Sequence, residues 1–116
     1  PDGVDNLADS QAGRKAGLDT IIPDYDDKSP FTSPVSSLTA NDRGIRGLGG
    51  NVSEWIDTDF DKPSPTNPNP LATVRGGNWR TANADEALSS YRIAVPPDTR
   101  RNTIGFRTVV ARKPQP

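Results

Sequence analysis

The chain contains no cysteine, no histidine and no methionine among its 116 residues. Thiolate catalysis, disulfide bonds and metal sites built on imidazole are therefore not available within this chain. Hydrophobic residues make up 31% and aromatic residues 6% of the sequence, which limits the hydrophobic core to a modest size. No apolar run approaches the roughly 18 residues that a membrane helix needs, so we expect no membrane span in this chain.

An excess of either charge is also lacking, because 14 basic residues face 15 acidic ones and the net charge is -1. This balance gives no basic surface for nucleic acid, and we expect no nucleic-acid partner. Twelve prolines and ten glycines predict many turns, while the large apolar residues gather in a few blocks. We therefore expect one loop-rich globular domain. The chain begins with Pro1 rather than methionine, which favours a processed product or a fragment.

Three separated blocks carry the most information: NDRGIRGLGGNVSEW at residues 41–55, VRGGNW at 74–79 and IGFR at 104–107. Their order and spacing resemble the C-terminal half of the formylglycine-generating enzyme family, also called sulfatase-modifying factors. The family pattern is N-x-x-G-L-x-x-x-x-G-N-V-x-E-W, then R-G-G-S-W, then R, then G-F-R. The resemblance implies that residues 1–116 form the C-terminal part of such a domain, without its N-terminal half.

The resemblance implies an irregular α+β fold similar to that of C-type lectins, rich in loops and with short twisted strands. We expect strands near residues 52–56, 72–76, 85–92 and 105–111. A surface loop is expected over residues 61–71, which hold four prolines. Residues 12–18 are too short a segment, and too closely flanked by glycine, to predict a helix with certainty.

Structural roles account for most motif residues, namely Trp55, Arg75, Gly76, Gly77, Trp79, Arg92, Gly105, Phe106 and Arg107. We expect the three aromatic side chains of this set to be buried against one another, since their burial is the main stabilising contribution available. Arg75 is expected to pair with Glu54 or Asp57. Arg107 is expected to donate to carbonyl oxygens or to a carboxylate.

The asparagine of the sequence Asn51-Val52-Ser53 matches a glycosylation signal. Its position inside a glycine-rich motif instead favours a buried structural role.

Members of the family bind calcium at two places, and the resemblance assigns the first to Asn6, Leu7, Asp27 and Ser29. Asn6 and Asp27 would supply side-chain oxygens, and Leu7 and Ser29 would supply carbonyl oxygens. Calcium prefers six to eight oxygen ligands, so the residue types are suitable. The alternative is a solvated acidic turn without a metal.

The second family site corresponds to Gly50, Val52 and Glu54, with two carbonyl oxygens and one carboxylate. The position where the family has an asparagine or aspartate is Gly47, so one oxygen ligand is lost. The alternative is that Glu54 accepts hydrogen bonds from backbone amides of the glycine-rich loop.

Catalytic members of the family oxidise a substrate cysteine with two cysteines that bind copper(I). Those cysteines correspond to positions near Thr81 and near Asp85 or Glu86, and Asn78 replaces the usual serine. None of these residue types substitutes for a thiolate. We therefore expect no copper and no oxidation of a substrate cysteine by this chain.

Three functional hypotheses follow from these observations. The first is a non-catalytic binding or structural module, an accessory part of an extracytoplasmic assembly. The second is a cysteine-free family enzyme with altered chemistry, whose catalytic groups lie outside this chain. The third is a lectin-fold ligand-binding protein, because residues 78–107 also resemble the variable region of lectin-fold proteins that retroelements diversify.

A lectin-like domain of this family closes its core with strands from both halves. We therefore expect a second polypeptide, either the missing N-terminal half or a different subunit, to cover an apolar edge of this chain. Residues 1–35 and the region of Trp79 are expected to lie nearest to that contact.

Overall fold

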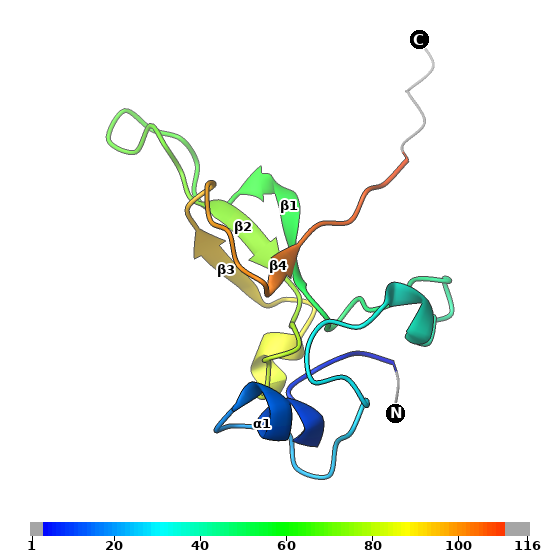
Figure 1. Ribbon diagram of the computed structural model, residues 1–116. Helices are drawn as coiled ribbons and strands as arrows, with labels where there is room; N and C mark the ends of the chain where they lie inside the picture. Colours follow the sequence, from blue (N-terminus) through cyan, green and yellow to red (C-terminus); the bar gives the residue numbers. More distant parts are fainter. Residues whose placement is uncertain (1–3, 111–116) are drawn as a thin grey trace.

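The computed structural model describes residues 4–110 and contains short elements joined by long loops. In chain order these elements are the helix α1 (Ser10–Ala16), the 3-10 turn η1 (Val35–Ser37), the strands β1 (Ser53–Asp59) and β2 (Ala72–Arg75), the 3-10 turn η2 (Ala84–Ala87), and the strands β3 (Arg92–Val95) and β4 (Ile104–Gly105). The molecule is thus a small domain with one mixed sheet and few helices, as the turn-rich composition predicts (Figure 1).

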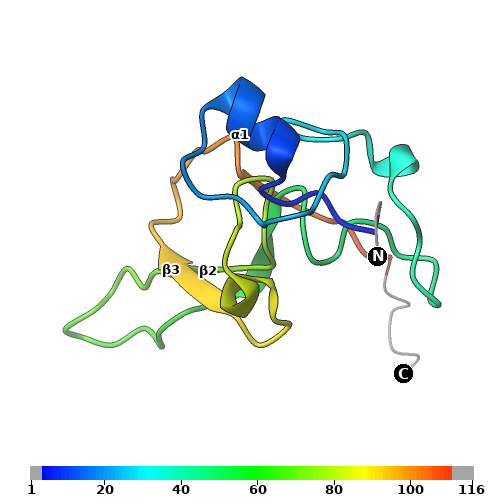
Figure 2. The ribbon, with the colours of Figure 1, turned by 90° about the horizontal axis from the view of Figure 1, so that it is seen from below.

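The four strands form a single sheet in the order β3-β2-β1-β4. β2 runs antiparallel to both β1 and β3, whereas β4 pairs with β1 in parallel. The register between β1 and β2 shifts between Ile56 and Asp59, where the strand has an irregularity. The loop between β1 and β2 projects away from the rest of the chain in both ribbon views (Figure 1 and Figure 2).

The strands predicted near 52–56 and 72–76 are confirmed as β1 and β2. The strand predicted over 85–92 is wrong, since η2 and a turn occupy most of that segment and β3 begins at Arg92. Asn83 caps η2 by accepting a hydrogen bond from the Asp85 amide, which favours a turn over an extended strand.

The last strand is much shorter than predicted, because β4 ends at Gly105 and pairs only with Ser53 and Glu54. The predicted range 105–111 also includes Ala111, which lies outside the described residues. The expected burial of Phe106 is therefore wrong: the residue is 77% exposed, because pairing with β1 ends at Gly105 although β1 itself continues to Asp59.

A short helix forms where the sequence did not clearly predict one. The Asp9 side chain caps α1 by accepting a hydrogen bond from the Ala12 amide at 2.7 Å. Gly17 ends the helix in the left-handed conformation, with φ of 67°. The Asp9 cap satisfies a backbone N–H of the first turn, which stabilises a helix of only seven residues.

The interior is as polar as it is apolar. The buried apolar residues are Ala8, Ala12, Leu38, Val74, Trp79 and Val95, and the buried polar ones are Asn6, Asp9, Ser33, Asn51, Ser53, Thr73 and Thr81. Trp79 packs edge-on against Phe31, with ring centroids 5.4 Å apart, and donates its indole N–H to the Asn102 carbonyl. Trp55 is only half-buried, so the expected cluster of three buried aromatics is wrong.

Asn51 lies at the centre of the polar interior and is 8% exposed, as expected for a buried structural asparagine. Its Oδ1 accepts from the Ser33 amide at 2.7 Å and from Asn6 Nδ2 at 3.1 Å, and its Nδ2 donates to the Ser33 carbonyl at 3.2 Å. Its backbone N–H donates to the Asn6 carbonyl, and its own carbonyl accepts from the Trp79 amide. One residue thus joins three segments that are far apart in sequence.

We predict that Asn51→Gly lowers the free energy of unfolding by about 2–4 kcal/mol, because buried groups of Asn6 and Ser33 lose their partner. Glycine tolerates the positive φ of 70° at this position, so the change isolates the side chain. Urea denaturation measures the effect. Asp24→Gly is the matched control, since Asp24 also has a positive φ of 57° but is exposed. Equal stability of the two variants would contradict the central role of Asn51.

Candidate functional site

The structure brings three of the four residues assigned to the first calcium site, Leu7, Asp27 and Ser29, into direct contact. The Asp27 carboxylate accepts from the Leu7 amide through Oδ2 and from the Ser29 amide through Oδ1, both at 2.9 Å. Asn6, the neighbour of Leu7, is fully buried. Its Nδ2 bonds the Phe31 carbonyl and other oxygens, whereas its Oδ1 is buried without a hydrogen-bond partner.

The charged form of the Asp27 carboxylate is disfavoured by its surroundings. Burial raises its pKa to about 6, and the charges of Asp9 and Asp26 act in the same direction, although the amides of Leu7 and Ser29 lower it. Asp9 is itself buried, and its Oδ2 accepts from the Asp27 amide at 3.1 Å. The charges of Asp9 and Asp26 thus add to the cost of ionising Asp27, although Asp26 is itself paired with Lys28.

These observations are compatible with a bound cation that prefers oxygen ligands. A buried amide oxygen without a partner costs free energy, and a calcium ion would satisfy it while reducing the repulsion at Asp27. Each carboxylate oxygen keeps acceptor capacity after accepting one N–H. Asn6 and Asp27 would hold the ion through side chains, and Leu7 and Ser29 through carbonyls. Within residues 4–110 no group of three His, Cys, Asp or Glu side chains makes a stronger candidate.

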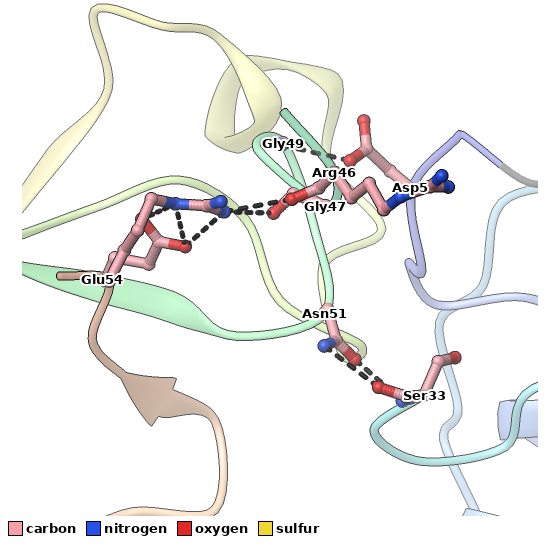
Figure 3. Close-up of polar contacts among 8 residues, drawn as sticks. Asp5, Ser33, Arg46, Gly47, Gly49, Asn51 and Glu54 are labelled. Atoms are coloured by element: carbon pink, nitrogen blue, oxygen red, sulfur yellow. Dashed lines mark hydrogen bonds and ion pairs between the residues drawn. The ribbon is translucent and has the colours of Figure 1, made fainter. Parts of the chain in front are cut away.

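The second predicted site is arranged differently. Glu54 forms an ion pair with Arg107 at 2.7 Å, and the same guanidinium donates to the carbonyl oxygens of Arg46 and Gly47 (Figure 3). The carboxylate does not bond amides of the glycine-rich loop in any hydrogen bond between described residues, so that alternative is wrong. The Gly50 carbonyl accepts from the Val52 amide at 2.9 Å.

A second calcium ion does not fit these residues. The positively charged guanidinium already bonds both oxygens of Glu54. Hydrogen bonding to this carboxylate raises the pKa of Arg107, so the charge is firmly retained. Gly47 supplies no side-chain oxygen, and we assign no metal to this position.

The position of the first family cysteine holds Thr81, which is buried in a tight turn. Thr81 Oγ1 accepts from the Asn78 amide at 3.1 Å, and the Thr81 carbonyl accepts from the Ala8 amide at 3.0 Å. Asn78 in turn donates from Nδ2 to Ser53 Oγ at 3.0 Å. Asp85 and Glu86, at the second position, belong to η2. These side chains build a turn and place no redox-active group there.

The arginines of the motifs lie on or beside the sheet. Arg75 is paired across the sheet with Glu54, yet its guanidinium donates to the Ser89 carbonyl at 2.9 Å. The predicted pairing of Arg75 with Glu54 or Asp57 is therefore wrong, because Arg107 takes the Glu54 carboxylate. The Arg92 guanidinium stacks over the Phe60 ring at 4.4 Å.

The motif glycines lie where backbones cross closely. A Cβ at Gly77 would lie 2.7 Å from the Gly49 carbonyl oxygen, so no larger residue fits there without movement. Gly76 adopts a positive φ of 78°, and Gly105 lies against Val52. The R-G-G block thus allows the β2 end to pass the glycine-rich loop.

Two contact residues were missed by sequence reasoning. Asp5 Oδ1 accepts from the Gly49 amide at 3.0 Å (Figure 3). The Asp5 carbonyl accepts from the Tyr25 hydroxyl at 2.5 Å. Ser33 bonds Asn51 through both its amide and its carbonyl. No local pattern marks Asp5 or Ser33, since their partners lie 44 and 18 residues away.

A cavity of about 470 Å³ lies between the N-terminal segment, the glycine-rich loop, the sheet and η2. Its lining includes apolar side chains of Ile45, Leu48, Ile56 and Leu88 and charged side chains of Asp5, Glu54 and Arg75. A second hollow, of about 350 Å³, lies beside Trp55 and Arg101. None of the helices in residues 4–110 has the length and apolar character to cross a membrane.

A family model for the sulfatase-modifying factor enzyme 1-like domain matches residues 3–112 of the sequence. Because this match takes in almost the whole chain, the chain belongs to that family. No curated protein matches the sequence.

Among solved structures, the one titled "Crystal Structure of CarF" aligns with 91% of this chain, at a TM-score of 0.62 and 22% identity. At this level of identity the likeness shows a shared fold alone. The chain spans about a third of the length of CarF, since the alignment covers 32% of that structure.

We predict that calcium stabilises the protein through Asp27, by about 2.7 kcal/mol at a concentration 100 times the Kd. Asp27→Asn should abolish the calcium-dependent rise in Tm, because it removes the carboxylate charge. Asp26→Asn is the matched control, since that neighbouring carboxylate pairs with Lys28. Thermal unfolding in calcium and in chelator measures both variants. An equal calcium response of the two, or none in the parent, would contradict the prediction.

Proposed function

We propose that this chain is a non-catalytic sulfatase-modifying-factor-like module that binds another polypeptide as an accessory part of a larger assembly. A fold similar to that of C-type lectins belongs to the same proposal. The observation that carries the proposal is an exposed stretch after β4, which we call the apolar segment 106–110. In it Phe106, Val109 and Val110 are 77%, 89% and 100% exposed. Apolar side chains gathered on one segment are typical of a surface that another chain covers.

The surroundings of this segment support a protein partner. Phe106 lies beside a hollow of about 190 Å³ whose lining includes Val35 and Val52. β4 is an edge strand of the sheet, so its outer side has free pairing capacity for an added strand. The partner is either another part of the same domain or a separate subunit. Trp79 is not part of this surface, because its side chain is 2% exposed.

The non-catalytic part of the proposal is supported by the turn at Thr81. A hydroxyl held by the Asn78 amide replaces the first thiol of the family, and the chain has no cysteine. A hydroxyl neither binds copper(I) strongly nor passes electrons to oxygen. The fold of the domain is compatible with the absence of the thiol chemistry.

An extracytoplasmic location is part of the same proposal. Calcium sites of extracellular modules have dissociation constants of about 10⁻⁴–10⁻³ M, which match the calcium available outside the cytoplasm. A site with one carboxylate, one amide oxygen and carbonyls is of this weak kind.

A ligand-binding role is the second candidate, and the 470 Å³ cavity favours it. Pockets of about 300–1,000 Å³ with apolar walls and a few charged groups are typical of small-molecule sites. Leu88 and Ser89 line this cavity and belong to the stretch 78–107.

We predict no oxidation of a substrate cysteine by this chain. A cysteine-containing peptide incubated with the protein, copper and oxygen should keep its thiol, because no thiolate pair is present. Mass spectrometry of the peptide is the measurement, with a catalytically competent family member as the positive control. Conversion to formylglycine would show that the chain is catalytic.

We predict that residues 1–116 alone self-associate or bind a hydrophobic dye, and that Phe106→Ser with Val109→Ser reduces both effects. The free energy of unfolding should stay nearly unchanged, since both side chains are already exposed. Sedimentation and dye fluorescence are the measurements.

Leu88→Ser is the matched control, because Leu88 is also exposed, at 53%, but lines the cavity. A loss of dye binding in this variant alone would favour the ligand-binding candidate. A monomeric parent without dye binding would contradict the proposed partner surface.

A further inference from the structure

The oxygen atoms around the Arg107 guanidinium are arranged like the ligands of a bound cation. Arg107 Nε lies 3.1 Å from each carboxylate oxygen of Glu54, and Nη2 lies 2.7 Å from Oε1. The same Nη2 lies 3.0 Å from the Arg46 carbonyl oxygen and 3.4 Å from that of Gly47. One positive group is thus surrounded by a carboxylate and two carbonyls, the oxygen types that a calcium ion prefers.

Three parts of the chain meet at this guanidinium. Glu54 belongs to β1, Arg46 and Gly47 belong to the glycine-rich loop, and Arg107 follows β4 (Figure 3). The side chains of Arg107 and Glu54 are 35% and 20% exposed, so the pair is partly shielded from water. Fork-shaped bonds from arginine to a carboxylate are among the stronger charged hydrogen bonds in proteins.

The surroundings of Gly47 explain why the chain has no side-chain oxygen ligand at this position. Gly47 has a positive φ of 59°, and a Cβ there would lie 2.8 Å from Leu38 Cδ1. An asparagine or aspartate tolerates this conformation, as Asn51 and Asp24 do, but at Gly47 it would displace the Leu38 side chain. Arg46 does not supply a second cation to Glu54, because its guanidinium bonds the Leu38 carbonyl instead.

We infer that the Arg107 guanidinium is a built-in cation that stands where the family relationship places a second calcium ion. It joins the segment after β4 to β1 and to the glycine-rich loop without any metal. A calcium ion would have to displace the guanidinium and leave it without its carboxylate, which is unfavourable for a partly buried charge. This part of the domain is consequently held together independently of calcium.

The first test counts bound calcium by atomic emission after equilibrium dialysis against millimolar calcium chloride. Glu54→Gln should bind as many equivalents as the parent, because Glu54 holds no calcium. A loss of one equivalent in Glu54→Gln would overturn the inference. Asp27→Asn reports separately on the first site, so a failure there leaves this comparison intact.

The second test asks whether calcium can replace the missing guanidinium. Arg107→Gln should lower the Tm in chelator by about 5 °C, and calcium should restore part of this loss. The restored part should be absent in the double variant Glu54→Gln with Arg107→Gln. An Arg107→Gln protein with the Tm and calcium response of the parent would contradict the inference. If Arg107→Gln does not fold, Arg107→Lys, which keeps the charge, should fold and respond to calcium like the parent.

Discussion

The hydrogen bonds of Asn51 are the constraint on which the rest of the structure depends. Its side chain bonds Asn6 and Ser33, and its backbone bonds Asn6 and Trp79. The neighbouring Gly50 allows the chains to cross, since a Cβ there would lie 2.5 Å from the Asn6 carbonyl oxygen. With few large apolar residues in the interior, the fold relies on polar groups that are costly to leave unpaired.

Two partly buried carboxylates, those of Glu54 and Asp27, lie in opposite electrostatic environments. Arg107 compensates Glu54, whereas Asp27 has an elevated pKa because it is buried near other acids. Asn6 links the first candidate site to the polar interior, because its Nδ2 bonds Asn51 while its Oδ1 has no hydrogen-bond partner. The interior hydrogen bonds therefore extend to Asn6, beside the site where we expect a calcium ion. At Glu54, by contrast, the compensating positive charge is Arg107 of the chain itself.

The fold was predictable where side-chain chemistry is local. The G-N-V-x-E-W and R-G-G blocks predicted β1 and β2, since glycines and alternating residues mark such strands. The ends of α1 carry an aspartate and a glycine, Asp9 and Gly17, which are residue types that mark helix ends in a sequence. Long-range partners were not predictable: Glu54 and Arg107 are 53 residues apart. Phe106 was misplaced because a strand was assumed to continue past Gly105, and pairing with a neighbour, not local sequence, decides that length.

The candidate site was predictable in its residue types and less so in its partners. The family resemblance assigned Asp27 and Asn6, and the motif gave Glu54 with two alternatives, a calcium ion or loop amides. The pairing of Glu54 with Arg107 was not among them. The turn at Thr81 explains why the frame does not require the family's thiols. Thr81 bonds Ala8 through its carbonyl and Asn78 through its hydroxyl, and neither contact involves sulfur. Because the backbone bonds of this turn are made regardless of the side chain, a family domain with threonine in place of the first cysteine forms the same turn.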